Sequence, residues 1–197
     1  MTEKKLLNIS LVPLDPSDRE KFIKDAQESF KYGATEEFGM RDNHLDKEGQ
    51  ILSRKLLEES LNNQKSTTFK IILDKEAVGR VILKLEKEKK TGELDILFVN
   101  SNVHSKGIGT STWMTIEKMY PEIELWIIHT PYFEKKNIHF YINRLGFHAV
   151  EFIHNRNRPK KNPDEFLGPE EFFKFEKRIK KKGVIYLISF LIDSIEI

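Results

Sequence analysis

The sequence contains no cysteine among its 197 residues. This absence excludes disulfide bonds, a thiolate nucleophile that could carry an acyl group, and thiolate ligands for a metal ion. No grouping of histidine, aspartate and glutamate has the spacing of metal ligands either. We therefore predict a protein without a metal site, whose chemistry does not pass through a cysteine.

A large excess of charge of one sign is also missing. The chain carries 33 basic and 31 acidic residues, for a net charge of +2. A nearly neutral chain has no global attraction to nucleic acid or to an anionic membrane. With 39% hydrophobic and 32% charged residues, the composition is that of an ordinary soluble domain.

Hydrophobic runs are short. The run Val184–Ile192 has nine residues, whereas a membrane-spanning helix needs about twenty. The first five residues, MTEKK, lack the apolar core of a signal peptide, so we expect a cytoplasmic protein with no membrane segment. We expect one domain over residues 1–183, followed by an apolar extension, 184–197. A docked strand, a short helix or a contact between two copies in a homodimer are all open roles for this extension.

The hydrophobic pattern of the first half predicts alternating strands and helices. Asp15 and Pro16 supply an N-cap and a preset first residue for a helix. The expected elements, in chain order, are a strand at 6–14, helices at 22–30 and 52–61, a hairpin of strands at 69–73 and 78–85, and a strand at 94–99.

Two glycines follow the last of these strands. Gly107 and Gly109 stand between the apolar run that ends at Val99 and a helical pattern that contains Trp113 and stops before Pro121. Glycines at such a turn let backbone N–H groups approach an anion, and the helix N-terminus adds a partial positive charge. The turn is therefore predicted to bind phosphate. Neither the P-loop pattern nor the dinucleotide pattern fits, because the Gly-Lys-Ser/Thr ending and the third glycine are missing.

The segment His104-Ser105-Lys106-Gly107-Ile108-Gly109 resembles the acyl-CoA motif of the GNAT superfamily of N-acetyltransferases. That motif reads Arg or Gln, two residues, Gly, any residue, then Gly or Ala. His104 departs from it, but the backbone amides that hold the pyrophosphate do not depend on this side chain. Residues 124–131 resemble the fifth strand of the family, and residues 137–147 resemble the helix and turn that follow it. The resemblance covers residues 94–153.

The resemblance implies an α/β (α+β) fold with a mixed, mostly antiparallel central sheet, flanking helices, and parted strands four and five. The order read along the chain, which is strand, two helices, three strands, helix, strand, helix and strand, matches this fold. Residues 172–179 fit either a helix or a last strand, and we prefer the strand because a similar strand closes the sheet in the family. It also implies that acetyl-CoA donates an acetyl group directly to a primary amine of a small molecule or a peptide. The cofactor-binding residues that it implies are Phe98, Val99, His104, Ser105, Lys106, Gly107, Ile108, Gly109, Thr110 and Asn137.

The family places a tyrosine on the helix after strand five, where it protonates the departing thiolate. Tyr141 has the expected spacing from Asn137, whereas a count back from Gly146 leads to Ile142. We prefer Tyr141 because its hydroxyl can donate a proton, and a packing role for it stays open. Asn137 is expected either to cap this helix or to bind the pantetheine amide.

Family members often use a carboxylate on strand four as a base that acts through water. Glu93 and Asp95 alternate along this strand, which puts both on one face, and we prefer Glu93. Solvated or paired carboxylates are the alternative. His129 and His139 are two further candidate proton acceptors.

Two other functions stay open beside acetyl transfer. One is a non-catalytic acyl-CoA-binding module. It is suggested by His104, which departs from the family motif, and by the count from Gly146, which places Ile142 and not Tyr141 at the position of the family's tyrosine. The other is nucleic-acid binding, suggested by basic residues near the C-terminus, but interspersed carboxylates and the absence of RNA-binding motifs favour a solvated face or a contact to the 3′-phosphate of CoA. These basic residues are His154, Arg156, Arg158, Lys160, Lys161, Lys177, Arg178, Lys180, Lys181 and Lys182. The amine substrate cannot be read from the sequence.

Overall fold

The computed structural model describes residues 6–35, 48–103, 107–154 and 171–179. These residues form a seven-stranded sheet in the order β1-β2-β3-β4-β5-β7-β6, with four α-helices packed against it. The strands are β1 Ile9–Pro13, β2 Ser66–Leu73, β3 Glu76–Glu86, β4 Thr91–Val99, β5 Leu125–Pro131, β6 His148–Ile153 and β7 Phe172–Arg178. The helices are α1 Arg19–Thr35, α2 Arg54–Asn62, α3 Ile108–Met119 and α4 Lys135–Asn143, with short 3₁₀ turns at Pro16–Asp18 and Lys87–Lys89.

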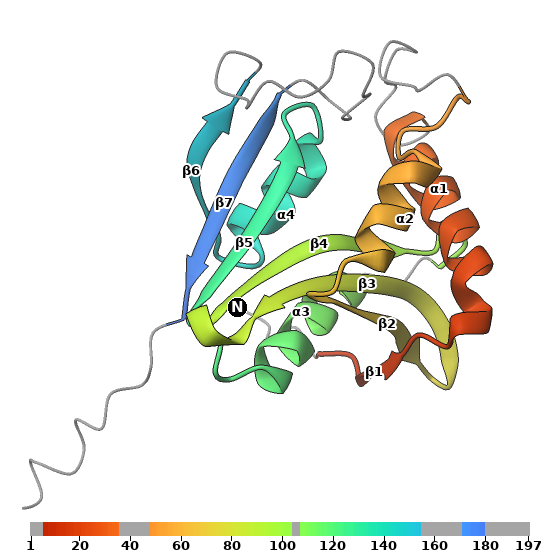
Figure 1. The fold of residues 1–197 in the computed structure, drawn as a ribbon, viewed down its shortest axis with the longest axis horizontal. Coiled ribbons are helices and arrows are strands. Elements are labelled where there is room, and N and C mark those ends of the chain that lie inside the picture. Colours follow the sequence, from red (N-terminus) through yellow and green to blue (C-terminus); the bar gives the residue numbers. More distant parts are fainter. Residues whose placement is uncertain (1–5, 36–47, 104–106, 155–170, 180–197) are drawn as a thin grey trace, which may run out of the picture.

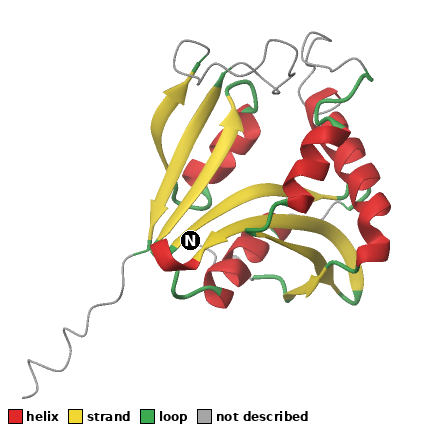
Figure 2. Ribbon diagram, viewed as in Figure 1, coloured by secondary structure: helices red, strands yellow, loops and turns green. Residues whose placement is uncertain are grey.

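The sheet has two wings. Strands β1 to β4 pair antiparallel in sequence order, and β5, β7 and β6 form a second antiparallel set. The wings are joined by the parallel pair β4 and β5. Beyond this joint, β5, β7 and β6 turn away from β4 (Figure 1). Figure 2 shows the helices packed on both wings.

Local sequence signals explain where the first elements begin. Asp15 accepts a hydrogen bond from the Ser17 N–H at 2.9 Å and so caps the 3₁₀ turn that leads into α1, which confirms the predicted cap. Ser53 caps α2 by accepting from the Leu56 N–H at 3.3 Å. The hairpin of β2 and β3 turns at Asp74 and Lys75, which both have positive φ.

Apolar side chains form one core on each face of the sheet. On the first face, Phe22 of α1 and Leu57 of α2 pack with Ile96 of β4. On the second face, Trp113 of α3 meets Trp126 of β5 edge to face, with ring centroids 5.1 Å apart. Each helix therefore buries its apolar stripe against the sheet.

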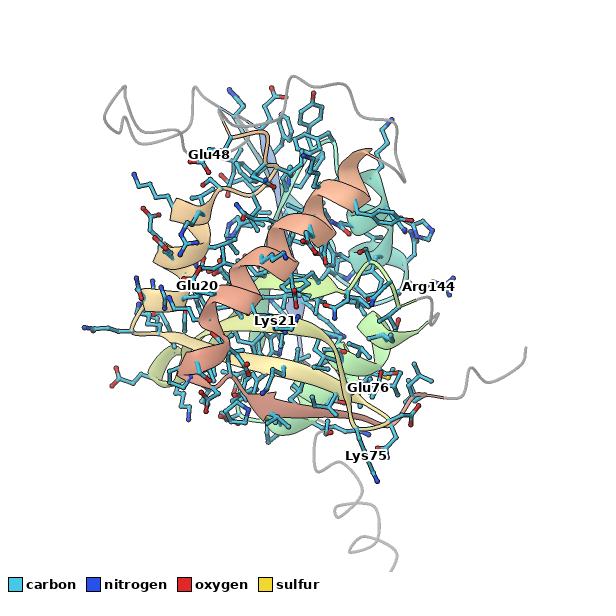
Figure 3. All side chains as sticks on the ribbon, turned by 90° about the vertical axis from the view of Figure 1, so that its right-hand side faces the viewer. Glu20, Lys21, Glu48, Lys75, Glu76 and Arg144 are labelled. Atoms are coloured by element: carbon cyan, nitrogen blue, oxygen red, sulfur yellow. The ribbon has the colours of Figure 1, made fainter. Side chains whose placement is uncertain are left out.

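A buried ion pair fixes α1 on the first face. Arg80 of β3 is 2% exposed, and its Nη1 lies 2.7 Å from Oδ2 of Asp25 on α1. A buried guanidinium needs such a partner, because an unpaired charge in the interior is costly. Figure 3 shows α1 crossing this face of the sheet diagonally.

The predicted fold class is confirmed, with one correction. The expected order ended on a single strand after the last helix, whereas the structure has two, β6 and β7. Strand β6 was missed because it is an edge strand with five exposed residues and one half-buried one, so its sequence carries no inward-facing alternation. The final strand at 172–178 is confirmed, and it lies between β5 and β6.

Some expectations fall outside the described residues. These include the extension 184–197, the motif residues His104, Ser105 and Lys106, and most of the basic residues near the C-terminus. Among the helices that the structure describes, none is long and apolar enough to cross a membrane.

Candidate active site

The site lies where β4 and β5 part. Their parallel ladder runs from Thr91 and Leu125 to Leu94 and Ile128, and it ends there. Strand β4 continues to Val99 on β3, while β5 continues to Pro131 on β7. The edges of the two strands therefore open into a notch beyond Leu94.

A β-bulge in β4 explains why the strands part at this point. Ile82 and Leu83 are neighbours on β3, but they pair with Ile96 and Leu94, so Asp95 is an extra residue on β4. A bulge bends its strand and increases the local twist. It also moves the buried residues from one face to the other, because Leu94 packs in the second core and Ile96 in the first.

One side of the notch opens into a cavity of 430 Å³, called here the cofactor-side cavity. It lies between the end of β4, the C-terminal part of α1, the start of α3 and one face of α4. Three of its lining residues, Lys136, His139 and Arg144, can carry positive charge, which suits a polyanionic ligand. Its lining residues are Ser29, Phe30, Gly33, Leu97, Phe98, Val99, Gly109, Glu134, Lys136, Asn137, His139, Phe140, Tyr141 and Arg144.

The predicted glycine turn lies at this cavity. Gly107 has φ of +113°, a conformation that favours glycine, and it is the N-cap of α3. The first N–H groups of a helix have no acceptor within the helix, so they can face an anion. Gly109 lets α3 pack closely on α4, because a Cβ at this position would lie 2.9 Å from Cζ of Phe140 on α4. The side chain of Ile108 is buried in the core, so this residue can offer a ligand only its backbone.

The predicted edge residues lie at the end of β4. Phe98 and Val99 both line the cofactor-side cavity. The Phe98 ring itself packs edge to face on Phe22, with centroids 5.5 Å apart. The peptide groups of this stretch of β4 pair with β3 on one side and face the notch on the other.

The other side of the notch opens into a cavity of 250 Å³, called here the substrate-side cavity. The two cavities meet at a shared set of side chains from α1, β4 and α4. The shared residues are Phe30, Leu97, Glu134, Asn137 and Tyr141.

Tyr141 lies at this junction. It is 9% exposed, and its ring packs against Phe147 and Phe175. Burial raises the pKa of Tyr141 to about 12, against the effect of a hydrogen bond with Thr130, so the hydroxyl stays protonated near neutral pH. Ile142 is 40% exposed. The helix therefore turns Tyr141, and not Ile142, toward the cavities.

Two candidate bases line the substrate-side cavity. Glu93 Oε1 lies 3.0 Å from Nδ1 of His129, and Asp95 Oδ1 lies 2.6 Å from Nζ of Lys84. Burial raises the pKa of Glu93, but the hydrogen bond with His129 and the charge of Lys84 outweigh it and hold this pKa below its usual value. Both carboxylates thus lie on one face, as expected, and both are paired. His139 lies on the cofactor side, apart from Glu93.

Of the two roles expected for Asn137, the structure excludes helix capping. The N-cap of α4 is Glu134, and Asn137 lies inside the helix. The Asn137 amide instead donates a hydrogen bond from Nδ2 to Oε2 of Glu134 at 2.9 Å.

Thr110, another residue predicted to bind the cofactor, lies at the start of α3 and is half-buried.

Sequence reasoning missed Glu134. This carboxyl is 8% exposed, lines both cavities, and has its pKa raised by burial. An acidic residue between a strand and a helix was the available signal, because carboxylates favour helix N-termini. Its burial between two cavities could not be read from that position. Within the described residues, no group of three His, Asp or Glu side chains could hold a metal ion.

A mostly antiparallel sheet that opens between two parallel strands, with a glycine turn and a helix N-terminus at the opening, defines the class of N-acetyltransferase folds. Residues 26–147 match the family model described as the acetyltransferase (GNAT) family. The chain belongs to this family.

Known proteins support this assignment. The uncharacterized protein YrkN of Bacillus subtilis (strain 168) is 36% identical over 173 residues, which cover 84% of this chain and 91% of YrkN. The ribosomal-protein-S18-alanine N-acetyltransferase of Escherichia coli has a TM-score of 0.60 at 12% identity, over 90% of this chain and 97% of its own. The spermidine N-acetyltransferase of Vibrio cholerae, solved with CoA and spermine, has a TM-score of 0.57 at 11% identity, over 86% of this chain and 95% of its own. At these identities the structural matches show the fold alone.

Proposed function

We propose that this protein transfers an acetyl group from acetyl-CoA directly to a primary amine. The observation that carries the proposal is the meeting of two cavities in the notch between β4 and β5, with Tyr141 at the junction. One cavity suits the acyl donor and the other suits the amine. Because the chain has no cysteine, the acetyl group passes in one step and not through a thioester with the protein.

The cofactor-side cavity fits acetyl-CoA. The free edge of β4 at Leu97–Val99 offers peptide groups to the pantetheine arm, and the N-terminus of α3 offers N–H groups to the pyrophosphate. Lys136 and Arg144 supply positive charge at the rim. Solved members of the fold that contain CoA, such as the Vibrio cholerae enzyme, support this assignment.

The substrate-side cavity supplies the acid–base chemistry. The attacking amine must be neutral, and we assign the removal of its proton to Glu93, which acts directly or through water beside His129. The new bond forms between the amine nitrogen and the acetyl carbon, and the bond from that carbon to sulfur breaks. Tyr141, protonated at neutral pH, donates to the sulfur that leaves. The bound ammonium loses two protons in all, one before the attack and one from the nitrogen as the amide forms. One of them replaces the proton that Tyr141 gives to the sulfur, and the other is released to water through Glu93.

The proposal predicts that acetyl-CoA stabilises the folded chain. At a hundredfold excess over its dissociation constant, a ligand adds about 2.7 kcal/mol to the free energy of unfolding. Gly107→Val should abolish the rise in melting temperature, because valine is strained at positive φ and the turn must hold its amides toward the pyrophosphate. Melting curves with and without acetyl-CoA measure this effect.

The matched control is Gly49→Val. Gly49 also has positive φ, with open space around it, but it precedes α2 and does not cap the α3 helix as Gly107 does. This variant should lose stability yet keep the full shift with acetyl-CoA. No shift with the unmodified chain would refute acetyl-CoA as the donor.

A further inference from the structure

The ionised Glu134 carboxylate has no cationic partner among the described residues. Its Oε2 accepts a hydrogen bond from the neutral amide of Asn137. In the part of the chain that the structure describes, no ion pair reaches this carboxylate. The other two carboxylates of the substrate-side cavity are both paired, Glu93 with His129 and Asp95 with Lys84.

A buried carboxylate without a cation is unfavourable, and a ligand that brings one relieves the cost. A primary ammonium group has three N–H donors and a full positive charge. It can therefore bind Glu134 at the junction of the cavities, close to Tyr141, where the proposed transfer occurs. Burial raises the pKa of Glu134, which is the expected mark of such an uncompensated group.

The rest of the substrate-side cavity is largely apolar. Its walls come from the segment around α2, from β5, and from single phenylalanines on α1 and β7. These apolar residues are Phe30, Ile51, Leu52, Leu56, Ile128, Pro131 and Phe172. A volume of 250 Å³ is below the range of about 300–1,000 Å³ that is usual for drug-sized ligands. The cavity therefore suits a small amine that carries an apolar group.

The same cavity disfavours two kinds of amine. A carboxylate beside the amino group, as in a free amino acid, would approach Glu93, Asp95 and Glu134. A second ammonium group further along the molecule would meet either the apolar walls or carboxylates that already have basic partners, Glu93 with His129 and Asp95 with Lys84.

We propose that Glu134 binds the ammonium group of the substrate, and that the substrate is a primary amine on an apolar stem with no carboxylate beside the amine. This inference rests on the proposed acetyl transfer. Glu134 acts here as a specificity-determining residue, and no covalent step is assigned to it.

Calorimetric titration of the full chain, saturated with CoA, tests the inference without requiring turnover. The probes are L-phenylalaninamide, L-phenylalanine and spermidine, of which the first two differ in the amide and the carboxylate. Phenylalaninamide should bind at least tenfold more tightly than either of the others. Equal or tighter binding of phenylalanine or spermidine, or no binding of phenylalaninamide, would overturn the inference.

Glu134→Gln tests the residue itself. Glutamine keeps an oxygen that can accept from Asn137 but loses the charge, so affinity for phenylalaninamide should fall at least tenfold while affinity for CoA is maintained. The matched control is Glu76→Gln on the hairpin of β2 and β3, an exposed glutamate that lies away from α4 (Figure 3), and it should change neither affinity. A purely structural role of Glu134 would leave amine affinity unchanged in Glu134→Gln, and that result would also overturn the inference.

Turnover then separates the two proposals. If phenylalaninamide binds as expected but acetyl-CoA and phenylalaninamide yield no acetylated product, the proposed function fails and the binding preference stands. If acetylation occurs but spermidine is the better substrate, the function stands and the inference fails.

Discussion

Two carboxyl groups of the substrate-side cavity respond to their surroundings in opposite directions. The pKa of Glu93 is lowered below its ordinary value of 4.5, because the His129 hydrogen bond and the Lys84 charge outweigh burial. The pKa of Glu134 is raised above the same value by burial. The ionised form of Glu93 therefore stabilises the fold, while the ionised form of Glu134 destabilises it.

These shifts predict opposite pH dependences for two identical substitutions. The contribution of Glu93 is present above pH 4.5 and is lost as the pH falls through its folded pKa, so Glu93→Gln should be less stable than the parent at pH 7 and equal to it in acid. The cost of ionised Glu134 is full above its folded pKa and disappears as the pH falls to 4.5. Glu134→Gln should therefore be at least as stable as the parent at pH 7, with a gain that shrinks in acid. Urea unfolding at pH 7 and at a series of lower pH values that extends below pH 4 measures both differences, and changes of the same sign at pH 7 would contradict this assignment.

At the scale of elements, close contacts between backbone and aromatic rings hold the notch in place. A Cβ at Gly92 of β4 would collide with the ring of Trp126, its partner in the ladder between β4 and β5. Trp126 is fully buried and packs on Trp113, so it cannot move aside. At Gly109 of α3 the nearest atom is the ring end of Phe140, which is only half-buried.

Alanine at these two glycines should therefore have different effects. Gly92→Ala should cost about 1–3 kcal/mol of stability, because extra volume in a packed core forces strain. Gly109→Ala should cost less, because Phe140 can shift and because alanine favours a helix by about 1 kcal/mol over glycine. Denaturant unfolding of the two variants provides the comparison, and an equal or larger loss in Gly109→Ala would show that the α3 and α4 contact is the tighter one.

The positions of most helices and strands could be predicted from the sequence, but the path of β4 could not. The bulge in β4 shows why. The alternation of buried residues continues through Gly92, Leu94, Ile96 and Phe98 without interruption. The bulge at Asp95 nevertheless moves these residues from one core to the other. A pattern of period two therefore located the strand but carried no sign of its bend. The edge strand β6 was missed for a related reason, since exposed residues leave no pattern.

For the whole molecule, local motifs predicted the backbone geometry at the cofactor-side cavity better than the side chains that line the substrate-side cavity. The glycine turn follows from a backbone requirement that the sequence displays, whereas the free edge of β4 was expected only from the family resemblance. The position of Tyr141 depends on how α4 packs against β5 and β7, and the counts from Asn137 and Gly146 disagreed. Glu134 was not predictable because its burial arises from contacts between α1, β4 and α4, which lie far apart in the sequence.

The central claim is that acetyl transfer occurs at the junction of the two cavities with Tyr141 as the proton donor. The most direct measurement is the rate of CoA thiol release from acetyl-CoA and phenylalaninamide by the parent chain and by Tyr141→Phe. A chain without cysteine adds no thiol of its own to this assay. The account predicts thiol release equal to the acetylated amine formed, and a fall in turnover of about 10²- to 10⁴-fold in the variant with unchanged affinity for acetyl-CoA. Equal rates in the two proteins, or thiol release without acetylated amine, would contradict it.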